Sequence, residues 1–100
     1  SPSKIENLLC LNEKIKQSFV YGDKKTYLVS LIVSETEENK KEIEFYLENL
    51  NKNLSLVEKV KKFKLIKEEF TIENGMLTPT LKLKRKKILE KYKEDLEKLY

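Results

Sequence analysis

The sequence contains no histidine and no tryptophan, and it has one cysteine, two glycines and two prolines. Because histidine is absent, the usual zinc sites and an imidazole general base are excluded, and we expect no metal site. The single Cys10 cannot form a disulfide within the chain, so we expect it on a helix face as a small apolar residue, in a reducing, cytoplasmic setting. No apolar run approaches the roughly 18 residues that a membrane-spanning helix needs. The sequence therefore predicts a soluble chain.

Charge is abundant and unevenly placed. The 100 residues carry 21 basic and 17 acidic side chains, a net charge of +4. Residues 1–80 hold thirteen lysines and thirteen acids, so the whole excess lies in residues 81–100, with eight basic and four acidic residues. The length and the hydrophobic fraction of 39% predict a single domain, residues 1–100, with a modest core.

Hydrophobic periodicity predicts the order helix, strand, strand, helix, strand, loop, helix. Capping boxes Ser3/Glu6 and Ser34/Glu37 mark two helix starts. The predicted elements are a helix ending near Leu11, a hairpin of Ile15–Tyr21 and Tyr27–Val33, a helix over 36–54, a strand Phe63–Ile66, and a helix marked by Ile88, Tyr92, Leu96 and Leu99. This order predicts an α+β fold in which helices flank a sheet of about three strands, the second of them central.

The basic stretch Thr78–Lys87 has three interpretations. Clustered cations could bind nucleic acid, but the following lysines alternate with acids as on a solvated helix, which argues against it. A lipid-binding helix would need apolar residues that the sheet also needs. The third interpretation is a loop that presents a functional group: Gly75 ends a turn, Pro79 keeps residues 77–80 extended, and Lys82 follows.

The segment Phe70–Arg85, FTIENGMLTPTLKLKR, resembles the C-terminal signature of long-chain fatty-acid CoA ligases, which are AMP-forming acyl-adenylate ligases. Most of that superfamily carries the pattern Pro-Lys-Thr-x-Ser-Gly-Lys-x-x-Arg, with which Thr78, Thr80, Lys82 and Arg85 are in register. Met76 stands for the first proline. Leu81 stands for the glycine, as it does in the long-chain branch.

The resemblance extends over nearly the whole chain and is weak only at about residues 34–60. Residues 1–6 are similar to the Ser-Pro-x-x-Ile-Glu segment after the family's hinge, and the hairpin and final helix also correspond. The resemblance implies a mobile C-terminal lid domain without its hinge and large N-terminal adenylation domain. Such a fragment is expected to be inactive alone.

The resemblance further implies ATP-dependent acyl-adenylate formation, then thioester formation with coenzyme A after the lid rotates. ATP, Mg²⁺ and coenzyme A would serve the full enzyme, with none bound by this fragment alone and coenzyme-binding residues unknown. The expected partners are the N-terminal domain and the long-chain fatty acid, with no nucleic acid and with possible peripheral membrane association.

Lys82 is the residue that the resemblance implies to be catalytic, because it matches the family's adenylation lysine. Gly75, Thr78, Pro79 and Thr80 are expected to shape its loop, with a positive φ at Gly75 and with Thr78 and Thr80 forming hydrogen bonds within the loop. We interpret Lys84 as a helix-surface residue. The remaining candidate is Arg85, which could bridge to acidic groups, contact the large domain or be solvated.

Two alternatives stay open. One is a non-enzymatic basic module that binds phosphates or anionic lipid. The other is the lid of a different acyl-adenylating enzyme that acts on aryl or amino acids.

Overall fold

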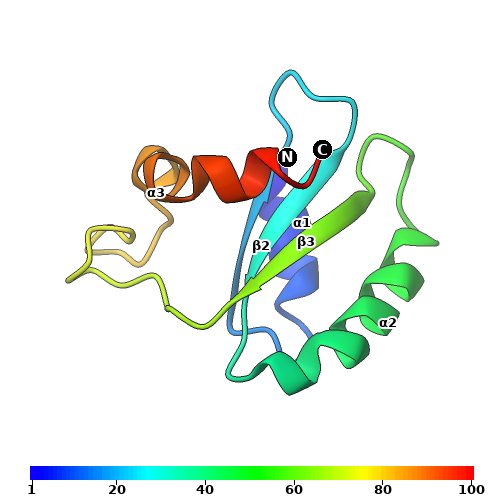
Figure 1. Ribbon diagram of the computed structural model, residues 1–100, viewed down its shortest axis with the longest axis horizontal. Helices are drawn as coiled ribbons and strands as arrows, with labels where there is room; N and C mark the ends of the chain where they lie inside the picture. Colours follow the sequence, from blue (N-terminus) through cyan, green and yellow to red (C-terminus); the bar gives the residue numbers. More distant parts are fainter.

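The computed structural model describes all 100 residues as a three-stranded sheet with helices packed around it (Figure 1). The elements are α1 (Pro2–Leu9), β1 (Gln17–Tyr21), β2 (Leu28–Val33), the 3-10 helix η1 (Glu37–Asn39), α2 (Lys40–Asn51), β3 (Val60–Ile66) and α3 (Arg85–Glu97). The α+β class, the number of strands and their order along the chain are as predicted.

The sheet has the order β1-β2-β3, so β2 is central. β1 and β2 form an antiparallel hairpin in which Phe19 lies opposite Leu31. β2 and β3 are parallel, with Ile32 opposite Leu65, and α2 provides the crossover between them. The central position of β2 explains its nearly unbroken apolar run, because a central strand with helices on both sides of the sheet is buried on both faces.

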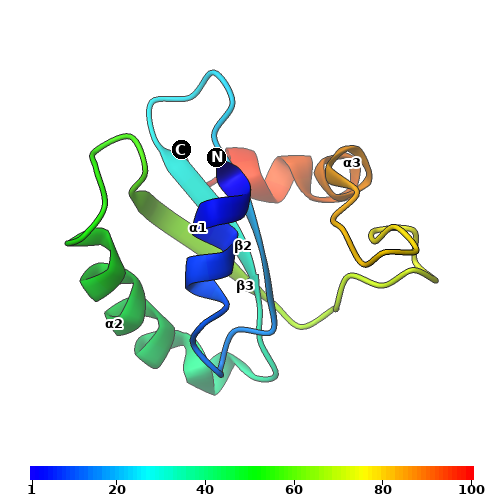
Figure 2. The ribbon, with the colours of Figure 1, turned by 180° about the vertical axis from the view of Figure 1, so that it is seen from behind.

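Two apolar cores lie on the two faces of the sheet. Successive side chains of β2 point to opposite faces of the sheet, so Val29, Leu31 and Val33 belong to one core and Ile32 belongs to the other. The first core also holds Ile88, Tyr92 and Leu96 of α3 together with Phe70, Met76 and Leu77, which precede α3. The second holds Ile5 and Leu9 of α1 and Ile43 and Leu47 of α2. Figure 2 shows α1 crossing the sheet on the side away from α3.

Both predicted capping boxes are wrong. α1 begins with Ser1 as its N-cap and without a side-chain cap, and the Glu6 carboxylate instead accepts a hydrogen bond from the Val20 N–H. The Ser34 hydroxyl donates to the Lys14 carbonyl, while Thr36 caps η1. In both cases a tertiary partner or a better-placed residue overrides the local pattern.

Several predicted boundaries also shift. α1 ends at Leu9, and Cys10 is its exposed C-cap residue. The prediction that Cys10 lies on a helix face as a small apolar residue is therefore wrong. The helix predicted over 36–54 divides into η1 and the shorter α2, and β3 begins three residues earlier than predicted, at Val60. No helix in the structure has both the length and the apolar composition to cross a membrane.

Candidate functional site

The segment 67–84, which joins β3 to α3, carries the predicted catalytic lysine. Its first part is fixed to the sheet by Phe70, whose side chain is buried in the core beneath α3. The Gln17 side-chain amide completes the attachment, because Nε2 donates to the Phe70 carbonyl at 2.9 Å and Oε1 accepts from the Phe70 N–H at 2.7 Å. Gln17 thus pairs with Phe70 as a neighbouring strand would, and it holds the segment against β1.

A turn follows in which Asn74 satisfies the local backbone. Its Oδ1 accepts from the N–H groups of Thr71 and Met76, at 3.0 and 3.1 Å, and its Nδ2 donates to the Glu69 carbonyl. Gly75 has φ +79°, in the left-handed region that glycine enters without strain. Asn74 and Gly75 thus direct the chain back to the core at Met76.

A small hairpin closed by Leu77 and Leu83 presents Lys82. These two leucines form an antiparallel bridge, and the Thr78 N–H donates to the Lys82 carbonyl at 2.8 Å. The Leu81 N–H donates to the Thr78 carbonyl at 2.8 Å, so residues 78–81 form a turn with Pro79 at its second position. The expectation that residues 77–80 are extended is therefore wrong.

The two threonine hydroxyls stiffen this hairpin. Thr78 Oγ1 accepts from the Lys82 N–H at 3.0 Å and lies 3.1 Å from Thr80 Oγ1. The backbone of Lys82 is thereby held by two hydrogen bonds to Thr78.

Leu81 completes the turn in an unfavourable conformation. Its φ of +65° is left-handed, which costs a side chain other than glycine about 1–2 kcal/mol. This geometry gives a physical reason for the glycine that the superfamily pattern has at this position. A leucine here retains the turn but strains it.

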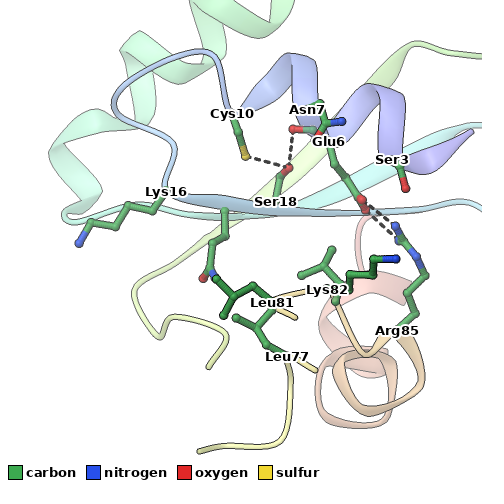
Figure 3. A pocket seen from close by; sticks show the side chains of 12 residues that line it. Ser3, Glu6, Asn7, Cys10, Lys16, Ser18, Leu77, Leu81, Lys82 and Arg85 are labelled. Carbon is green, nitrogen blue, oxygen red and sulfur yellow. Dashed lines mark hydrogen bonds and ion pairs between the residues drawn. The ribbon is translucent and has the colours of Figure 1, made fainter. Parts of the chain in front are cut away.

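The Lys82 ammonium has no hydrogen bond or ion pair within the domain, and the residue is exposed. Its side chain extends over an open groove between α1 and the hairpin (Figure 3). The groove has a volume of about 630 Å³ and is lined mostly by polar residues, among them Asn7, Lys16 and Ser18. The lysine at the tip is a cation without an internal partner.

Arg85, three residues later, has a partner in the domain. Its Nη1 and Nη2 donate to the two carboxylate oxygens of Glu6 at 2.9 and 2.7 Å, and the guanidinium lies 5.7 Å from the centre of the Phe19 ring. The hydrogen bonds to Glu6 raise the pKa of Arg85 above its ordinary value. Lys84 is exposed and is the N-cap residue of α3. The structure thus brings Arg85 and Lys82 to one groove in different electrostatic situations.

Sequence reasoning missed the supporting roles of Glu6 and Gln17. Both form contacts between segments far apart in the chain, Glu6 with Arg85 and Gln17 with Phe70. No local pattern indicates such partners. The one available signal was that Glu6 directly follows the buried Ile5. That signal was ambiguous, because Glu6 also fitted a capping box with Ser3.

All 100 residues match the family described as the AMP-binding enzyme C-terminal domain. The chain belongs to this family. Long-chain-fatty-acid–CoA ligase 6 of Rattus norvegicus is 33% identical over the whole chain, and long-chain-fatty-acid–CoA ligase FadD15 of Mycobacterium tuberculosis is 30% identical. The chain spans only 18% and 21% of the lengths of these two relatives.

Solved structures of adenylating enzymes share the fold. The A-PCP didomain of the carboxylic acid reductase from Segniliparus rugosus, in complex with AMP, matches with a TM-score of 0.86 and 28% identity over the whole chain and 16% of its own. The adenylation domain of the carboxylate reductase from Mycobacterium chelonae matches with a TM-score of 0.85 and 31% identity, over 98% of this chain and 17% of its own. The fold is therefore that of the C-terminal part of an adenylate-forming enzyme.

Proposed function

We propose that residues 1–100 act as the mobile C-terminal domain of a longer, AMP-forming long-chain fatty-acid CoA ligase, and that Lys82 is its catalytic lysine for adenylation. The observation that carries the proposal is the unpaired Lys82 ammonium at the tip of a hydrogen-bonded hairpin. The ligase relatives, 30–33% identical over the whole chain, support the substrate class. The expected partner is a large adenylation domain.

In the first half-reaction a fatty-acid carboxylate attacks the α-phosphate of ATP and pyrophosphate leaves. Both reactants are anionic, so a cation between them reduces their repulsion and stabilises the charge that develops in the transition state. The Lys82 ammonium is a compact charge on a flexible stem. One such donor in a water-excluding site contributes about 2.7–4 kcal/mol to transition-state stabilisation.

In the second half-reaction the thiol of coenzyme A attacks the acyl carbonyl and AMP leaves. Lys82 has no task in this step, so the domain can rotate and withdraw it. The buried anchors Phe70, Met76 and Leu77 favour this motion as a rigid body, because they fix the hairpin to the core beneath α3.

Magnesium accompanies ATP in such reactions. This domain contains no group of three His, Cys, Asp or Glu side chains arranged to hold a metal ion. We therefore assign it no part in metal binding, and we derive no step through the ion. Its contribution to ATP is the Lys82 ammonium, which is free to contact a phosphate.

The test uses the complete polypeptide with Lys82→Ala and with Lys84→Ala as the matched control, since Lys84 is an exposed lysine two residues away. We expect Lys82→Ala to slow fatty-acid-dependent pyrophosphate release about a hundred- to thousandfold. Thioester formation from preformed acyl-adenylate should stay near the wild-type rate. Lys84→Ala should affect neither step strongly. Equal losses in both half-reactions of Lys82→Ala would contradict the assignment.

A second candidate is the lid of an acyl-adenylating enzyme with a different acid or acceptor. The carboxylate reductase structures favour it, because their identities of 28–31% are close to those of the ligases. Supplying free coenzyme A to the complete polypeptide separates the two. A long-chain ligase forms the thioester, whereas the alternative stops at the adenylate or prefers another acid.

The non-enzymatic basic module has less support. Arg85 and Lys91, which lie in the basic C-terminal region, are paired with Glu6 and Glu68. These cations are partly neutralised within the domain. Peripheral membrane association and a cytoplasmic location stay predictions.

A further inference from the structure

Leu81 combines backbone strain with exposure. It adopts a left-handed φ of +65°, which glycine or asparagine accepts more readily than leucine. Burial does not offset this strain, since Leu81 is 67% exposed. Within the domain, the backbone at this position opposes a leucine and the core gains little from one. Strained backbone positions cluster at functional sites, so this conformation, at the residue next to Lys82, is the reason to look for a role of the side chain outside the isolated domain.

The position of Leu81 indicates which state that is. It directly precedes Lys82 in the hairpin, and both line the groove beside α1 (Figure 3). Any motion that carries the Lys82 ammonium into a cleft also carries Leu81, because the hairpin backbone is closed by the bonds between Thr78 and Lys82. The leucine thus enters the adenylation site with the lysine.

We propose that Leu81 is an apolar shield for Lys82: when the hairpin enters the adenylation cleft, the Leu81 side chain displaces water from around the ammonium and so strengthens its field on the reacting groups. This inference rests on the proposed function of Lys82. Leu81 acts through Lys82 as a positioning residue and does not itself contact the reacting atoms.

The physical basis is the dependence of electrostatic stabilisation on solvent. A charge interaction that is weak in water becomes several times stronger where water is excluded. Exposed apolar surface is unfavourable in water, so burial of the Leu81 side chain on docking would return part of the free energy lost to backbone strain. The shield therefore acts in the adenylation pose and has no task when the lid rotates.

Leu81→Asn is the central variant, because asparagine tolerates the left-handed backbone but is polar. In the complete polypeptide we expect it to slow adenylation roughly tenfold, a part of what one electrostatic donor contributes. The KM for ATP and the rate of thioester formation from preformed acyl-adenylate should be unchanged. Leu81→Met keeps an apolar side chain and should retain most of the wild-type rate of adenylation.

The matched control is Leu56→Asn. Leu56 is also an exposed leucine, at 78%, but it does not have a positive φ and it does not line the Lys82 groove. We expect no change in adenylation for this variant. A loss equal to that of Leu81→Asn would mean that surface apolarity in general, and not a shield beside Lys82, is responsible.

A double-mutant cycle tests whether Leu81 acts through Lys82. In the Lys82→Ala background, Leu81→Asn should cause little further loss of adenylation, because the shielded charge is gone. Equal losses in both backgrounds, or a Leu81→Met variant as slow as Leu81→Asn, would overturn the shield. If Lys82→Ala alone leaves adenylation intact, the proposed function fails. If Lys82→Ala slows adenylation but the Leu81 variants leave its rate unchanged, that function stands and this inference fails.

Discussion

Arg85 and Glu6 are joined by two hydrogen bonds, at 2.7 and 2.9 Å, that connect the first residue of α3 to α1. The Glu6 carboxylate also accepts from the Val20 N–H at 2.8 Å, so α1, β1 and α3 meet at one buried carboxylate. The first turn of α3 contains no acid and no side-chain cap. Arg85 thus places a cation at the positive end of the helix dipole, where a positive charge is unfavourable, and its pairing with the Glu6 carboxylate offsets that charge. The hairpin of Lys82 directly precedes this junction.

Arg85→Ala should destabilise the chain by about 2 kcal/mol, because it leaves a buried carboxylate with one remaining donor. The loss should be below the 3–5 kcal/mol typical of a fully buried pair, since the Arg85 side chain is 40% exposed. Arg85→Lys keeps the charge but not the paired geometry and should lose about half as much. Urea unfolding measures both changes. Lys86→Ala, on the same exposed turn, is the control, and an equal loss there would refute the role of the junction.

Gln17→Ala should loosen the segment 67–84 more than it weakens the fold. The variant loses both hydrogen bonds to Phe70, while the Phe70 side chain remains in the core. We expect faster hydrogen exchange over residues 70–84 with little change in β2, which is buried on both faces. A uniform rise across the whole sheet would show that Gln17 supports global stability instead. Lys16→Ala is the matched control, because the exposed Lys16–Glu69 ion pair in the same region should contribute little.

Gly75→Ala tests backbone conformation without a steric clash. A Cβ at Gly75 would meet no atom within 4 Å, so the cost should come from φ +79° alone. We expect a loss of about 1 kcal/mol in the free energy of unfolding, and a smaller loss for Gly75→Asn. Equal stability of the alanine variant and the wild type would mean that the turn relaxes to another conformation. Urea denaturation of the three proteins provides the comparison.

Sequence patterns predicted the elements that depend on local rules. The continuous apolar run of β2 indicated a central strand, and the spacing of Ile88, Tyr92 and Leu96 indicated the buried face of α3. These predictions succeeded because periodicity reports directly which face is buried. The turn at Gly75 was predictable from residue type, since a left-handed backbone conformation favours glycine.

The contacts that position Lys82 could not be read in this way. Pro79 favoured an extended segment, but it also fits the second position of a turn, and the hydrogen bond from Leu81 to Thr78 decides between them. Glu6 fitted a local cap, yet Arg85 lies 79 positions away in sequence. Pairing over such distances depends on the packing of α1 and α3 on the sheet, which no local pattern contains.

Tyr92 and Tyr100 should make the fold sensitive to alkaline pH. Burial, together with the hydrogen bond to Glu68, raises the pKa of Tyr92 from its ordinary value of 10.0 to about 12. Burial and the nearby Tyr21 and Tyr27 raise the pKa of Tyr100 to about 12 as well. In both side chains the neutral phenol is favoured in the folded state, mainly because burial disfavours the charged phenolate. The Tyr92 hydroxyl also donates a hydrogen bond to Glu68 that a phenolate cannot donate.

The stabilisation that these raised pKa values represent is complete below pH 10 and is lost as the pH rises from about 10 to about 12. We therefore expect the free energy of unfolding to fall across this range. Tyr92→Phe and Tyr100→Phe should each make the fall less steep, because the protons that the folded state retains there are removed. All other residues are the same in the wild type and the variants, so the difference between them isolates the tyrosines. Identical slopes in wild type and both phenylalanine variants would show that the two phenols ionise equally in the folded and unfolded chain.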